Sequence, residues 1–149
     1  MRFLTNHDLV WLNTTITGAP QDYDYFAVEN ATAGQYVYGT TSDVVASAAT
    51  AYRRLIKALP FSHGNRRTAF IVMVSFLAEN GWQLSLEAPL VVDVLASLEN
   101  QALDARPTLD PLVEPIPPAT SMASSGMRQI ACWCMNRHEK VLQLLATTD

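Results

Sequence analysis

The residues best suited to chemistry lie between Pro60 and Ala69, where a turn-forming sequence precedes two adjacent arginines. Arg66 and Arg67 fall in the first turn of a predicted helix, where their positive charge opposes the helix dipole. Free backbone N–H groups at such a helix end bind anions, and guanidinium groups bind phosphate oxygens in pairs. The pattern therefore predicts a phosphate or nucleotide site.

Gly64 and Asn65 complete this predicted site. Glycine allows a positive φ angle and a close approach of backbone to phosphate. Asn65 has two interpretations, since its amide either binds phosphate oxygens or caps the helix. Arg67 also has two interpretations. Its guanidinium either binds phosphate or forms a buried ion pair with an acidic side chain.

The run from Leu59 to Arg67 resembles the motif of the Fic/Doc (death-on-curing) family, His-x-Phe-x-Asp/Glu-Gly-Asn-Lys/Gly-Arg. The residues that match it are Phe61, Gly64, Asn65 and Arg67. Arg66 replaces the lysine of the death-on-curing branch. The stretch 76–82 also looks like the segment that follows the motif in that branch. Phe61 is assigned to the motif's structural framework.

Two motif positions depart from the family. Leu59 stands at the position of the histidine that acts there as general base, a role typically worth ~10²–10⁴ in rate. Leu59 has no proton-accepting atom, and it continues an apolar stripe that includes Tyr52 and Leu55. The spacing therefore predicts a core leucine.

His63 stands at the acidic position of the motif. The resemblance implies that a residue at this position binds magnesium, which in turn contacts the phosphates of a nucleoside triphosphate such as ATP. Magnesium prefers oxygen ligands, so an imidazole weakens any such site. Two interpretations of His63 remain open. It takes part in the chemistry, as a donor to phosphate or a displaced base, or it is a solvent-facing turn residue.

The resemblance implies transfer of a phosphate or AMP group from a nucleoside triphosphate to a Ser or Thr hydroxyl of a target protein. In the death-on-curing branch the implied target is a translation elongation factor, and the implied partner is an antitoxin chain. Without the motif histidine, the protein is expected to be catalytically impaired. The alternative is a non-catalytic protein-binding module that keeps the Fic fold and an anion site.

Composition narrows the class of protein. The 149 residues are 49% hydrophobic and 16% charged, which predicts one soluble domain over 1–149. No apolar run reaches the ~20 residues that span a bilayer. The N-terminus lacks a signal-peptide pattern, and Cys132 and Cys134 are spaced poorly for a disulfide, so we expect a cytoplasmic protein. These two cysteines and His138 also do not fit zinc spacing, so no metal site is predicted.

The net charge of −4 argues against a face for duplex nucleic acid. Positive charge is nevertheless concentrated before and within the motif. Arg53, Arg54 and Lys57 precede it, and we interpret these three as support for a helix C-terminus.

Apolar spacing and capping residues predict the elements that position the site. The expected helices cover about 6–17, 42–59, 67–79, 89–103 and 127–145. Residues 19–41 are expected to be turn-rich, and residues 105–125 to form a proline-rich loop serving as a lid or linker. The alternating segment Gln35, Tyr36, Val37 and Tyr38 predicts an extended flap, which the resemblance implies positions the target side chain. The predicted fold class is all-α, a Fic-like helical bundle with a short β-hairpin flap.

Overall fold

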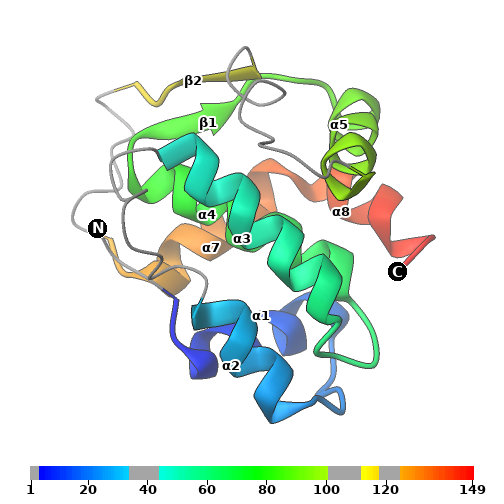
Figure 1. Cartoon of the computed structure of the whole chain (residues 1–149). Coiled ribbons are helices and arrows are strands. Elements are labelled where there is room, and N and C mark those ends of the chain that lie inside the picture. Colours follow the sequence, from blue (N-terminus) through cyan, green and yellow to red (C-terminus); the bar gives the residue numbers. More distant parts are fainter. Residues whose placement is uncertain (1–3, 34–43, 101–111, 118–124) are drawn as a thin grey trace.

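The computed structural model describes residues 4–33, 44–100, 112–117 and 125–149. The predicted flap at 35–38 lies outside these residues, as does most of the predicted proline-rich loop. The described helices are α1 (Asn6–Thr17), α2 (Tyr25–Ala33), α3 (Val44–Ala58), α4 (Asn65–Glu79), α5 (Ala88–Asn100), α7 (Met127–Arg137) and α8 (Glu139–Ala146). The described strands are β1 (Trp82–Leu84) and β2 (Val113–Pro115), which form an antiparallel pair (Figure 1). The predicted all-α fold class with a short antiparallel sheet is confirmed, but this sheet joins 82–84 to 113–115 and is not the predicted flap.

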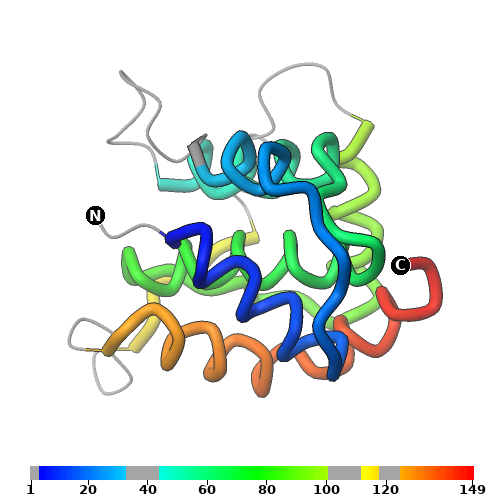
Figure 2. The backbone as a smooth tube through the Cα atoms, turned by 90° about the horizontal axis from the view of Figure 1, so that it is seen from below, coloured from blue at the N-terminus to red at the C-terminus, as the bar shows by residue number. Residues whose placement is uncertain are grey.

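Helix α4 is the centre of the bundle and lies between α3 and α7 (Figure 2). Every residue from Thr68 to Ala78 is buried, so its side chains meet the core on all faces. A helix that is apolar all round must be enclosed by other elements, which here are chiefly α1, α3 and α7. The helical interpretation of this run is therefore confirmed.

Local sequence signals set several helix ends. The Thr5 side chain accepts from the Asp8 backbone N–H and the Asp8 carboxylate accepts from that of Thr5, both at 3.1 Å, so the predicted capping box begins α1. Helix α3 ends at Ala58, just before Pro60, as predicted. Pro89 lies in the first turn of α5, as predicted.

Helix α2 lies within the stretch that the sequence predicts to be turn-rich, so that prediction is wrong for Tyr25–Ala33. The Asp24 carboxylate accepts from the backbone N–H groups of Phe26 and Ala27, at 3.0 and 3.2 Å. These are the hydrogen bonds of an N-cap, and an aspartate before an apolar run is a readable signal for one.

Two further predictions need correction. Strand β2 lies inside the predicted proline-rich loop, where Glu114 pairs with Gln83 of β1, so residues 113–115 are sheet and not loop. The predicted final helix 127–145 is two helices, α7 and α8, which meet at His138 with φ −108° and ψ 28°. None of the described helices is long and apolar enough to cross a bilayer.

Candidate functional site

Residues 59–64, which we call the motif loop, join α3 to α4. Leu59 begins the loop in the left-handed region, with φ 44°, and it is 59% exposed. The prediction that Leu59 is a core leucine is therefore wrong. That prediction assumed that the helix continues through Leu59. The turn before Pro60 instead rotates the side chain away from the apolar stripe and into solvent.

A leucine with a positive φ is uncommon, because its Cβ crowds the backbone. Glycine or asparagine is the usual residue at this place after a helix. The Leu59 N–H still donates to the Leu55 carbonyl at 3.0 Å, which closes the last turn of α3. The position aligned with the family's histidine is thus both strained and open to solvent.

The motif loop is paired with residues 22–24, which precede α2. Tyr23 forms an antiparallel bridge with Phe61, and their rings lie 6.1 Å apart. The Asp24 N–H donates to the Pro60 carbonyl at 2.9 Å, and the Ser62 N–H donates to the Asp22 carbonyl at 2.9 Å. Sequence reasoning missed this pairing, since nothing near Tyr23 indicates a partner almost forty residues away.

Asn65 braces the loop from inside. Its Oδ1 accepts from the Phe61 N–H at 3.0 Å, and its Nδ2 donates to the Phe61 carbonyl at 2.7 Å. Both ends of the amide are thus bound to one backbone residue, and Phe61 itself is buried. This contact differs from both interpretations of Asn65, because Gly64 takes the N-cap position and supplies no side-chain cap.

Gly64 is required for two reasons. Its φ of 80° is a left-handed conformation, and a Cβ at this position would lie 2.5 Å from Thr17 Cγ2 and 3.0 Å from Asn13 Nδ2. The buried Asn13 holds α1 against the loop, since its Nδ2 donates to the His63 carbonyl at 2.9 Å and to Thr68 Oγ1 at 3.1 Å. The close approach of backbone that the sequence predicts at Gly64 is therefore toward α1.

We define the α4 cradle as the backbone N–H groups of Arg66 and Arg67 together with the Arg67 guanidinium. All of them donate to the side-chain carboxylate of Asp149. Arg66 N lies 2.8 Å from Asp149 Oδ1, and Arg67 N and Nε lie 3.1 and 2.9 Å from Asp149 Oδ2. The Asp149 side chain is only 4% exposed. The helix N-terminus thus holds an anionic group, as its chemistry predicts, but the group comes from the protein itself.

The two arginines diverge. Arg67 forms a buried ion pair with Asp149, in agreement with the second interpretation of this residue. The Arg66 guanidinium turns to α5 and forms an ion pair with the Glu99 carboxylate, and its Nη1 lies 3.3 Å from Thr148 Oγ1. Only Arg67 therefore adds its side-chain charge to the cradle.

Glu99 links α3, α4 and α5. Its Oε1 accepts from the Tyr52 hydroxyl at 2.6 Å, while its Oε2 pairs with Arg66. Burial, and then the neighbouring Glu99 carboxylate, raise the pKa of the Tyr52 hydroxyl well above its usual 10.0, so it stays a neutral donor. Sequence reasoning did not connect Glu99 with the motif, because only the packing of α5 brings it there.

The His63 side chain is exposed in the motif loop. Its backbone carbonyl accepts a hydrogen bond from Asn13 of α1. Within the described ranges, no group of three or more His, Cys, Asp or Glu side chains could hold a metal ion. An imidazole at the acidic position does not fit magnesium, and the Asp149 carboxylate is engaged by the cradle. We therefore derive no step through magnesium.

Other sequence candidates do not form a reactive centre. Cys132 is exposed and Cys134 is buried, where burial raises the pKa of the Cys134 thiol to about 12. That thiol is an unreactive core group. A comparison with known proteins finds no matching family model, no similar curated protein and no similar solved structure. The family resemblance therefore depends on the motif residues themselves.

Proposed function

We propose that this protein is a Fic/Doc-type protein with a phosphate site at the N-terminus of α4 and an impaired transfer step. The observation that supports the site most directly is the convergence of three N–H donors of Arg66 and Arg67 on one carboxylate. A phosphate group offers the same kind of oxygen acceptor with more negative charge. Phosphate entry requires that the Asp149 carboxylate leave the cradle.

The proposed transfer joins a target hydroxyl oxygen to a phosphorus atom of the nucleoside triphosphate and breaks the bond from that phosphorus to the bridging oxygen of the leaving group. The leaving group is pyrophosphate if AMP is transferred and the nucleoside diphosphate if phosphate is transferred. The hydroxyl proton must pass to a base. Leu59 supplies none, which is why we propose that the transfer step is impaired. His63 is the one histidine of the motif loop, and we assign it no role in the transfer.

Thermal-shift titration with ATP, ADP and AMP, with and without magnesium, tests the phosphate site. We expect nucleotide to raise the melting temperature of the wild type and of Arg128→Ala, which removes a surface ion pair with Asp8. The shift should be smaller in Arg67→Ala than in the wild type, because a cradle donor and its charge are gone. No response to any nucleotide or to phosphate in the wild type would contradict the site.

The transfer step is tested separately with Leu59→His. Incubation with ATP labelled at the α- or γ-phosphate and a purified translation elongation factor should label the factor more strongly than the wild type does. The labelled position distinguishes AMP transfer from phosphate transfer. If nucleotide binds but Leu59→His transfers no label, loss of the base is not what limits the reaction.

A second proposed function is a non-catalytic protein-binding module, which is favoured by apolar side chains gathered before and within the motif loop. Tyr23, Tyr25 and Phe26 are 47%, 56% and 74% exposed, and Leu59, at the start of the motif loop, is also exposed. Exposed aromatic side chains are enriched where proteins bind one another. An antitoxin-like partner that co-purifies with the wild type but not with Phe26→Ser would favour this function.

A further inference from the structure

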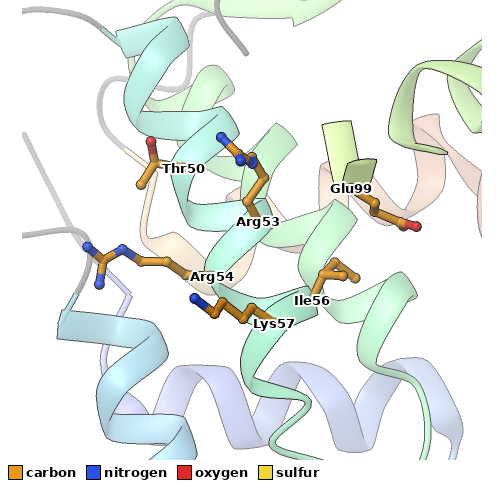
Figure 3. A pocket seen from close by; sticks show the side chains of 6 residues that line it. All are labelled: Thr50, Arg53, Arg54, Ile56, Lys57 and Glu99. Carbon is orange, nitrogen blue, oxygen red and sulfur yellow. The ribbon is translucent and has the colours of Figure 1, made fainter. Parts of the chain in front are cut away.

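A cavity of about 610 Å³ lies on the outer side of α3, facing the end of α5 (Figure 3). The described side chains that line it are Thr50, Arg53, Arg54, Ile56, Lys57 and Glu99. Its volume falls in the range of small-molecule sites, roughly 300–1,000 Å³. None of the residues of the α4 cradle is among these lining residues, so the cavity is separate from the cradle.

The described residues that line the cavity carry an excess of positive charge. Arg54 and Lys57 are exposed, and neither makes a hydrogen bond or ion pair with any described residue. Figure 3 shows both side chains extending toward the same side of α3. Like charges on neighbouring turns of a helix repel one another, so an anion between them would stabilise both.

Among the described residues that line the cavity, Glu99 is the one carboxylate, and it does not neutralise the charge of Arg54 and Lys57. Glu99 is already engaged by the Tyr52 hydroxyl and by the Arg66 guanidinium. Its carboxylate points away from Arg53 in Figure 3. The interpretation that these basic residues serve only to support a helix C-terminus is also too narrow, because only Lys57 lies in the last turn of α3.

We propose that this cavity binds a small polyanion of the di- or triphosphate class. Arg54 and Lys57 supply the charge, and the Thr50 hydroxyl supplies a neutral hydrogen-bond donor on the same face of α3. Glu99 joins the cavity to Arg66, whose backbone N–H belongs to the α4 cradle. The site is nevertheless defined by its own side chains and does not depend on the proposed transfer function.

Isothermal titration calorimetry with inorganic tripolyphosphate tests the proposal on the full chain. Lys57→Gln should weaken binding by about fivefold, the effect of ~1 kcal/mol for one partly exposed charge pair. Arg54→Gln/Lys57→Gln should weaken it by about twenty-five-fold if the two contributions add. Lys140→Gln, the same change at an exposed position of α8, should leave the affinity within about twofold.

A double variant, Arg67→Gln/Asp149→Asn, separates the cavity from the α4 cradle, because it removes both charges of the cradle pair together. We expect the cavity of this variant still to bind tripolyphosphate, with an affinity that Lys57→Gln again lowers about fivefold, and we expect wild-type affinity to fall as salt concentration rises. The proposal is overturned if the wild type does not bind tripolyphosphate, or if Lys57→Gln and Lys140→Gln behave alike. It is also overturned if the double variant abolishes binding, or if hexaglutamate binds where tripolyphosphate does not.

Discussion

The Asp149 carboxylate and the Arg67 guanidinium form a buried ion pair, with Arg67 Nε 2.9 Å from Asp149 Oδ2, although the two residues are 82 positions apart. The same carboxylate accepts hydrogen bonds from the backbone N–H groups of Arg66 and Arg67, in the first turn of α4. A group in this position interacts with the helix dipole, with two backbone donors and with one cation at once. It therefore stabilises the start of the central helix and competes with any external anion.

Replacing Asp149 with asparagine should open the α4 cradle to external anions. The neutral amide competes less well for the N–H groups and for Arg67, so we expect ATP or phosphate affinity to increase by about tenfold, the equivalent of ~1.4 kcal/mol. Calorimetric titration measures this change. Asp93→Asn, at an exposed position of α5, is the matched control and should leave the affinity unchanged. Equal affinities in Asp149→Asn and the wild type would show that the carboxylate does not compete.

Two of the three described glycines with left-handed conformations provide a test of packing against α1. Gly64 and Gly18 have φ angles of 80° and 82°, but only a Cβ at Gly64 would meet neighbouring atoms. Both Gly→Ala changes carry the conformational cost of about 1 kcal/mol. Gly64→Ala should lose a further ~1–3 kcal/mol of unfolding free energy to the clash with Thr17. Urea denaturation measures both variants, and equal losses would contradict the close approach of the motif loop to α1.

Leu59 offers a way to relieve backbone strain at the motif loop. Asparagine tolerates the left-handed conformation, and little burial is lost because the leucine side chain is 59% exposed. Leu59→Asn should therefore raise the free energy of unfolding by about 0.5–1 kcal/mol. The control is Leu90→Asn, which removes a 50% exposed leucine from α5 and should lower stability slightly through helix propensity. A loss of stability in both variants would indicate that Leu59 is not strained.

His138 predicts a loss of stability in mild acid. Burial, and then the charge of Arg137, lower the pKa of its imidazole from 6.5 to about 4. Between these values the unfolded state binds more protons than the folded state, so stability falls as the pH drops from 6.5 toward 4. The shift corresponds to a loss of about 3 kcal/mol across this window.

Urea denaturation at pH 7 and pH 4.5 measures this effect. In His138→Gln the difference between the two pH values should shrink, although the variant also loses the edge-on contact of the imidazole with Phe70, whose ring centroid is 5.2 Å away. His7→Gln, at an exposed position of α1, should keep the wild-type pH dependence. An unchanged pH dependence in His138→Gln would assign the acid sensitivity to other groups.

Much of the fold could be predicted from the sequence because its signals act over a few residues. The hydroxyl and carboxylate of Thr5 and Asp8 cap the helix that they begin. Pro60 excludes a helical conformation for the residue before it, and the unbroken apolar run after Arg67 must be enclosed. Strand β2 was missed because a proline-rich segment resembles a loop until its partner strand is known, whereas α2 was missed although the Asp24 cap marks its start.

The sequence by itself determined that α4 begins with a positively charged, anion-binding turn, since that follows from the order of Gly64, Arg66 and Arg67 along the chain. Only the tertiary structure decided what meets this turn. Packing brings Asp149 into the cradle and directs Arg66 to Glu99, and these contacts join residues whose distance along the chain gives no signal of proximity. Leu59 shows the same division, because its periodicity holds only while the helix continues, and one left-handed residue turns a predicted core side chain out into solvent.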